Sequence, residues 1–190
     1  MFEPETISIT PYHGEIIDSA RKLALAEHCK HKHGVLPYSY HLTAVAGIVS
    51  CFTTDPEVIA AAWLHDVVED CPDIDTEIVE RMTSARTASI VDLLTDPPGY
   101  NRRAAKAIAL PRIAADPDAT LVKLADRYHN QASTIMDRSQ KHARMYFSEL
   151  VQFLNILDYR AYPQTDPRWK FAMLYHMVEE QRKGLFEVAS

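Results

Sequence analysis

Histidine and aspartate residues stand at three places along the chain where they could together bind a metal ion. His65 and Asp66 are adjacent, His41 lies 24 residues earlier, and Asp126 lies in a distant apolar segment. Two imidazoles and two carboxylates form a mixed nitrogen and oxygen donor set, which suits Mn, Fe, Zn or Ni better than Mg. A buried ionised carboxylate is costly unless it is paired or coordinates a metal. The set therefore indicates a divalent-metal site.

Two further carboxylates follow the first pair, in the segment His65-Asp66-Val67-Val68-Glu69-Asp70. If this segment ends a helix, His65 and Glu69 are four residues apart, as are Asp66 and Asp70, so all four face adjoining sides of that helix. They would then converge on one cleft. By itself, the hexapeptide is equally compatible with a frayed acidic helix end that contains a hydrogen-bonded histidine.

Helices are the elements that must bring these residues together. Hydrophobic residues make up 47% of the 190 positions, glycine occurs only 5 times, and Ala, Leu and Ile recur at helical spacing. These features predict an all-α protein, and the length predicts one domain over residues 1–190. We expect a compact helical bundle with its motifs at about 15–150 and C-terminal helices at 139–187 packed on it.

Apolar periodicity, proline and capping residues predict the boundaries of these helices. Residues 1–12 are expected to form an irregular arm, and Asp96-Pro97-Pro98-Gly99 to break the chain. Pro111 is expected to kink or end the helix that contains it. The expected helices cover about 15–30, 41–51, 55–69, 75–82, 88–94, a segment after 101, 119–134, 139–160 and 166–187.

Composition restricts the classes of partner. The net charge of −6 argues against general nucleic-acid binding, which needs a broad basic surface, although a local basic cluster could bind a small anion. The three cysteines, Cys29, Cys51 and Cys71, lack CxxC spacing and fit reduced, buried thiols. No stretch is apolar enough to span a membrane and no signal segment opens the chain. We expect a soluble, cytoplasmic protein.

Several segments are similar to motifs of a known family when they are taken together and in order. The succession of His41, His65-Asp66 and Asp126 resembles the H…HD…D signature of the HD superfamily. The flanking residues resemble its alarmone-hydrolase branch, namely the hydrolase domain of RelA/SpoT proteins and the stand-alone small alarmone hydrolases. The matching segments are Pro37-Tyr38-Ser39-Tyr40-His41, Ala61-Ala62-Trp63-Leu64-His65-Asp66-Val67-Val68-Glu69-Asp70, Leu93-Leu94-Thr95-Asp96 and Val122-Lys123-Leu124-Ala125-Asp126-Arg127-Tyr128-His129-Asn130.

This resemblance implies roles for the residues at the matching positions. It implies that Mn²⁺ is the cofactor and that it is held by His41, His65, Asp66 and Asp126. It also implies that Glu69 and Asp70 take part in catalysis, where a carboxylate can accept or relay a proton. Spacing does not decide which of the two is the general base.

The resemblance also implies a set of substrate contacts. These are Lys32, His33, Tyr38, Asn130, His142 and Tyr146. Two segments depart from the family pattern: Lys32 and His33 stand where relatives have an adjacent basic pair with arginine, and His142 stands where they have arginine. Because arginine's planar fork is lost, hydrogen bonding to the base can differ, and the sequence leaves guanine and adenine both open.

The resemblance implies a metal-dependent nucleotide 3′-pyrophosphohydrolase that acts on (p)ppGpp or a (pp)pApp-type alarmone and releases pyrophosphate. Two alternatives remain open: another HD-type nucleotidase, and a nucleotide-sensing or toxin-neutralising protein with a weakened site. We expect no nucleic-acid partner. We also expect no synthetase region after residue 190, so that any opposing alarmone synthetase would be another protein.

Overall fold

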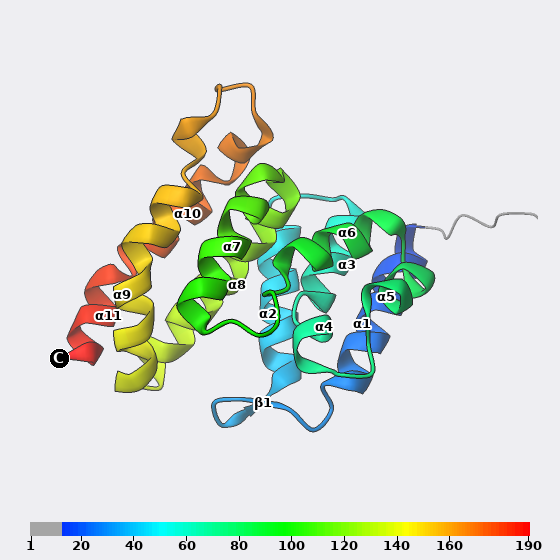
Figure 1. The fold of residues 1–190 in the computed structure, drawn as a ribbon, viewed down its shortest axis with the longest axis horizontal. Helices are drawn as coiled ribbons and strands as arrows, with labels where there is room; N and C mark the ends of the chain where they lie inside the picture. Colours follow the sequence, from blue (N-terminus) through cyan, green and yellow to red (C-terminus); the bar gives the residue numbers. More distant parts are fainter. Residues whose placement is uncertain (1–12) are drawn as a thin grey trace, which may run out of the picture.

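The computed structural model describes residues 13–190, and the arm expected at 1–12 lies outside them. Helices dominate this part of the chain, so the predicted all-α class is confirmed (Figure 1). The helices are α1 (His13–Glu27), α2 (Tyr38–Ser50), α3 (Pro56–Leu64), α4 (Val67–Asp70), α5 (Thr76–Met82), α6 (Ala85–Leu94), α7 (Arg102–Ala115), α8 (Pro117–Met136), α9 (Gln140–Ile156), α10 (Ala172–Glu180) and α11 (Arg182–Ala189).

Short polar side chains begin many of these helices, as the sequence suggested. Asp55, Asp75 and Asp116 each accept hydrogen bonds from backbone amides in the first turn of α3, α5 and α8. Proline follows at the first helical position of α3 and α8, where its missing amide hydrogen costs nothing. These caps fix where α3 and α8 start.

Helix α8 forms the centre of the bundle. It packs against α2, α3, α6 and α7 on one side and against α9, α10 and α11 on the other (Figure 1). Every residue from Ala119 to Arg127 is buried, including Lys123, Asp126 and Arg127. Ionisable side chains therefore lie inside the molecule and need partners there.

The expected continuous helix at 55–69 is wrong. Helix α3 ends at Leu64, and a turn at His65 and Asp66 precedes the single turn of α4. Asp66 has φ −107° and ψ −3°, which departs from helical geometry. The spacing argument that placed the four polar residues on one helix therefore fails. The turn instead directs His65 and Asp66 toward the same point.

Of the two outcomes expected at Pro111, the end of the helix is wrong: Pro111 lies inside α7, at an exposed position. A second expectation is also corrected. The helix expected at 166–187 is divided into the 3₁₀ helix η2 (Pro167–Phe171), α10 and α11, with a break at Gln181. A second 3₁₀ helix, η1 (Tyr159–Ala161), follows α9.

A small hairpin closes one end of the bundle. Its strands β1 (Lys32–His33) and β2 (Leu36–Pro37) are antiparallel, and Gly34 between them has φ +62°. The positive φ favours glycine, whereas the nearest atom to a Cβ at this position, Oδ2 of Asp137 at 2.8 Å, belongs to a flexible side chain that could move away. Among the described residues, no helix is long and apolar enough to cross a membrane.

Candidate metal centre and its cleft

Three separate segments bring the predicted ligands together. His41 lies in the first turn of α2, His65 and Asp66 form the turn between α3 and α4, and Asp126 lies midway along α8. Both imidazoles are almost fully buried, with 1% exposure for His41 and 2% for His65. The side chains meet at the bottom of a cleft rather than on a surface.

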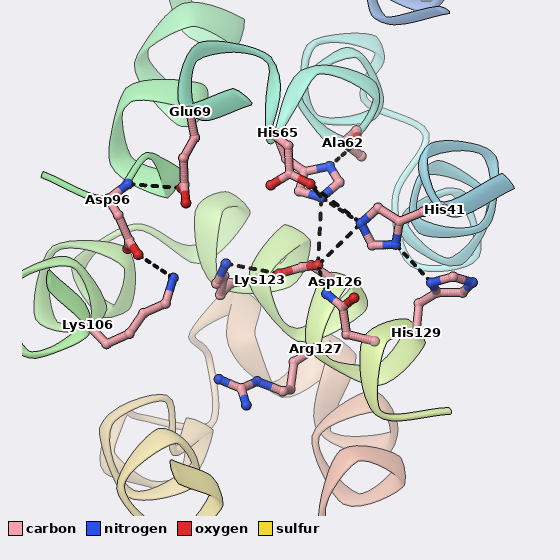
Figure 2. A network of polar contacts seen from close by, with 12 residues as sticks. His41, Ala62, His65, Glu69, Asp96, Lys106, Lys123, Asp126, Arg127 and His129 are labelled. Carbon is pink, nitrogen blue, oxygen red and sulfur yellow. Dashed lines mark hydrogen bonds and ion pairs between the residues drawn. The ribbon is translucent and has the colours of Figure 1, made fainter. Parts of the chain in front are cut away.

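The donor atoms of the four residues face one another at short distances. Nε2 of His41 lies 3.1 Å from Nε2 of His65. Oδ2 of Asp66 lies 2.9 Å from Nε2 of His65 and 3.6 Å from Nε2 of His41. Oδ1 of Asp126 lies 3.5 Å from Nε2 of His41 and 3.7 Å from Nε2 of His65. Figure 2 shows both imidazoles directed at Asp126.

The opposite nitrogen of each imidazole has its own partner (Figure 2). Nδ1 of His65 donates to the backbone oxygen of Ala62 at 2.9 Å, which leaves a lone pair for Nε2 in the neutral ring. Nδ1 of His41 lies 2.8 Å from Nδ1 of His129. Such partners orient metal-binding histidines and fix the nitrogen that faces the metal.

The electrostatics of the cluster favour a cation. Burial alone would lower the pKa of His65, but the charges of Asp66 and Asp126 outweigh it and raise the pKa to about 10. Burial likewise opposes ionisation of Asp126, but the Lys123 ammonium, 2.9 Å from Oδ2, helps to lower the pKa of Asp126 well below its usual value. The carboxylates that stabilise a proton on His65 would stabilise a metal cation at the same place.

The four residues fit a divalent ion. Two ligands bonded at about 2.1 Å and at right angles are about 3 Å apart, close to the separations between the donor atoms. His41, His65 and Asp126 each present one donor atom within 4.8 Å of the others. Nitrogen and oxygen donors, with both Nδ1 atoms engaged elsewhere, suit a borderline metal.

A cleft of about 190 Å³ opens beside the four predicted ligands. Its lining includes both predicted catalytic residues, Glu69 and Asp70, and three predicted substrate contacts, Tyr38, Asn130 and Tyr146. The Tyr38 hydroxyl donates to Asp66, and Oε2 of Glu69 accepts the backbone amide of Asp96 at 3.3 Å. Partial burial and the charges of Asp66 and Glu69 raise the pKa of Asp70.

Four positive side chains also line the cleft and form its cationic wall: Arg102, Lys106, Lys123 and Arg127. Lys106 lies 2.7 Å from Asp96, while Glu149 bridges Arg102 and Arg127 at 2.7 Å and 3.1 Å. A second hollow of about 420 Å³ shares Arg102, Lys106 and Arg127 with the cleft. The cationic surface formed by the two hollows together is larger than the area that one phosphate group would cover.

The remaining predicted substrate contacts lie at different distances from the metal cluster. His33 reaches it, because Nε2 of His33 lies 2.8 Å from Oδ1 of Asn130 and its ring stacks on His41. Lys32 is exposed on β1 and is not part of the cleft lining. His142 is exposed in the first turn of α9, where it hydrogen-bonds to Ser139.

Sequence reasoning missed two residues that support the ligands. His129 holds His41, and Lys123 holds Asp126, yet neither was assigned a role. Both lie three residues from Asp126 on α8, on either side of it. That spacing within an apolar helix is a signal that could have identified them.

Comparison with known families gives a match over most of the chain. The family model described as HD domain matches residues 20–152. A Synechocystis protein named as a probable guanosine-3′,5′-bis(diphosphate) 3′-pyrophosphohydrolase is 36% identical over 57% of this chain. The chain spans only a small share of several bacterial relatives, between 15% and 28% for three of them.

Shorter relatives are covered more fully. The Mus musculus protein named guanosine-3′,5′-bis(diphosphate) 3′-pyrophosphohydrolase MESH1 is 33% identical over 60% of this chain and 69% of its own length. A solved structure described as a metazoan ortholog of SpoT that hydrolyzes ppGpp superposes with a TM-score of 0.70 over 87% of this chain and 97% of that one, at 24% identity. That likeness supports the fold.

Proposed function

The chain belongs to the HD domain family, and from this premise we propose that it is a Mn²⁺-dependent hydrolase that removes the 3′-pyrophosphate from (p)ppGpp or a related (pp)pApp-type alarmone. The observation that carries the proposal is the cleft itself. Asp66, Glu69, Asp70 and Asp126 line it together with four cationic side chains. The relatives named as guanosine-3′,5′-bis(diphosphate) 3′-pyrophosphohydrolases support the substrate class.

His41, His65, Asp66 and Asp126 would hold the ion. When bound, a divalent ion supplies Lewis-acid activation of water and neutralises phosphoryl charge. Glu69 and Asp70 are the nearby carboxylates that can accept the proton released during hydrolysis. Asn130 hydrogen-bonds to both Asp126 and His33 and lines the cleft, so it would orient the substrate beside the metal.

The cationic wall would bind the polyanionic substrate. Lys106 and Arg102 lie where they can neutralise phosphoryl oxygens in the cleft, and the second hollow extends that surface for the other diphosphate. The hairpin with Lys32 and His33 would lie beside the nucleoside.

The decisive experiment measures pyrophosphate release from ppGpp and from ppApp, with and without Mn²⁺. We expect release that depends on the metal and is abolished in Asp66→Asn, which keeps the side-chain shape but removes its charge. Cys51→Ser, an exposed site, is the matched control. Absence of pyrophosphate release from both nucleotides would refute the substrate assignment. Orthophosphate release from 5′-monophosphates would favour a nucleotidase instead.

A further inference from the structure

A second group of metal-binding side chains lies on the other side of Tyr38 from the candidate metal centre. His28 follows the end of α1, His31 precedes β1, and Cys71 caps the end of α4. Each offers one donor atom within 4.8 Å of the other two. Nδ1 of His28 lies 2.9 Å from Nδ1 of His31, and Sγ of Cys71 lies 4.0 Å from Nδ1 of His28.

Burial fixes this group in place. His28 is 2% exposed and Cys71 is 3% exposed, whereas His31 is half-buried and gives access from solvent. The His28 ring stacks on Tyr38 with centroids 4.7 Å apart. Burial lowers the pKa of His28 to about 4, so the imidazole is neutral near pH 7, the state in which it binds a metal.

Two imidazole nitrogens that face each other need a proton or a cation between them. The nitrogens of His28 and His31 are 2.9 Å apart, at hydrogen-bond separation, and a shift of a few tenths of an ångström would let both bind one ion. In a tetrahedral site with bonds of about 2.0 to 2.3 Å, donor atoms are about 3.3 to 3.6 Å apart. Moderate side-chain rotation would bring Cys71 from 4.0 Å into that range.

The sulfur atom distinguishes this group from the candidate metal centre. Thiolate and imidazole ligands favour Zn²⁺, whereas sites built from carboxylates accept harder ions such as Mn²⁺. Three protein ligands leave a fourth position for water. The donor set therefore selects a different metal from the one assigned to His41, His65, Asp66 and Asp126.

A reactive thiol is a poorer explanation of the same residues. Burial, reinforced by the charges of Asp70 and Glu27, raises the pKa of Cys71 to about 11. A thiol in that state is a weak nucleophile, but a coordinated metal ion deprotonates it outright. Cys29 and Cys51 are exposed and lie outside the group.

We propose that His28, His31 and Cys71 form a second metal site, selective for Zn²⁺, that joins the end of α1 to the end of α4. Both segments border the cleft: His28 stacks on Tyr38, and Cys71 directly follows Asp70. Zinc at this site would hold Tyr38 and Asp70 in position. The proposal does not depend on the identity of the substrate.

The test replaces the bound metal with Co²⁺ in chelator-treated full-length protein and records its absorption spectrum. We expect a near-ultraviolet thiolate-to-cobalt charge-transfer band in the unaltered protein and in folded Asp126→Asn, which changes a predicted ligand of the candidate metal centre and none of the second site. The band should disappear in Cys71→Ser and persist in Cys29→Ser and Cys51→Ser. No band in the unaltered protein, or a band that survives Cys71→Ser, would overturn the proposal.

A second measurement covers the case in which Cys71→Ser does not fold. His31→Ala changes a half-buried loop residue, and we expect it to weaken Zn²⁺ affinity at least about tenfold by competition with a chromophoric chelator. Zinc bound per chain should fall by about one ion relative to the unaltered protein. Unchanged affinity and stoichiometry in a folded His31→Ala variant would contradict the site. Because these measurements report metal binding, they are independent of any failure to hydrolyse alarmones.

Discussion

Nδ1 of His129 lies 2.8 Å from Nδ1 of His41, on the side of the His41 ring that faces away from the other ligands. Burial, together with the charges of His41 and His33, lowers the pKa of His129 to about 4, so it is neutral near pH 7. When the hydrogen of this bond is on Nδ1 of His41, Nε2 of the neutral His41 ring carries a lone pair that faces His65 and Asp126. His129 therefore positions a ligand without being one.

We expect His129→Ala to weaken Mn²⁺ affinity about 10-fold to 100-fold, because the His41 ring loses the partner that fixes its orientation. Isothermal titration calorimetry of the metal-free protein measures this directly. His176→Ala removes a histidine that pairs with Tyr159 and Glu179 and serves as the matched control. Equal affinities in the two variants would show that His129 does not support the metal centre.

In the metal-free protein, we expect Asp126→Ala to lower the free energy of unfolding by about 3 to 5 kcal/mol. The reason is that Lys123, which is buried and lies 2.9 Å from Asp126, would keep its charge without its partner. Urea denaturation measures the loss. Adding Lys123→Met should recover most of it; a double variant no more stable than Asp126→Ala would argue against this ion pair as the cause.

We expect Tyr146→Phe to raise KM for the alarmone about 10-fold to 100-fold, because one hydrogen bond to a charged group is lost. The ring would remain, and with it the contact with the Arg127 guanidinium, 4.8 Å from the ring centroid. Steady-state kinetics should show a smaller effect for His142→Ala, since His142 is exposed and pairs with Ser139. An unchanged KM in Tyr146→Phe would remove Tyr146 from the substrate contacts.

Acid should weaken the ion pair between Arg86 and Asp116. Burial opposes ionisation of Asp116, but hydrogen bonds from Arg86 and from the amides of Ala119 and Asp118 outweigh it and lower its pKa. A carboxyl group whose pKa is lowered by folding contributes stability above its unfolded value of about 4, and the contribution is lost as the pH falls through the folded pKa.

We therefore expect Arg86→Met to cost about 1 kcal/mol at pH 7 and less at pH 3, as measured by urea denaturation. Arg112→Met is the matched control, because Arg112 pairs with an exposed aspartate, Asp92, and should contribute almost nothing at either pH. An Arg86→Met penalty of equal size at both pH values would mean that the charge of Asp116 is not responsible.

The sequence predicted which residues meet at the metal centre better than it predicted how they meet. The order and type of His41, His65, Asp66 and Asp126 were enough to bring them together. The helix break after Leu64 was not predicted, because the apolar run up to Leu64 reads as continuous helix and no glycine or proline marks the turn. Local propensity did not reveal a turn that tertiary contacts stabilise.

The C-terminal region shows the same limit. The periodicity of 166–187 predicted one helix, but Phe171 and Gln181 mark changes between η2, α10 and α11. Apolar side chains continue through both changes and pack on α8 and α9, so their spacing carries no sign of the breaks. Long-range packing, which a pattern of single residues does not encode, decides where these helices end.

One helix, α8, carries a predicted ligand, the ammonium that pairs with it, the histidine that supports His41, and the amide beside the cleft: Asp126, Lys123, His129 and Asn130. Their mutual positions are set by helical register rather than by flexible connections. A single inserted residue before Lys123 would turn the four by about 100° relative to the start of α8. An insertion there would displace all four groups at once, whereas a substitution changes only one of them.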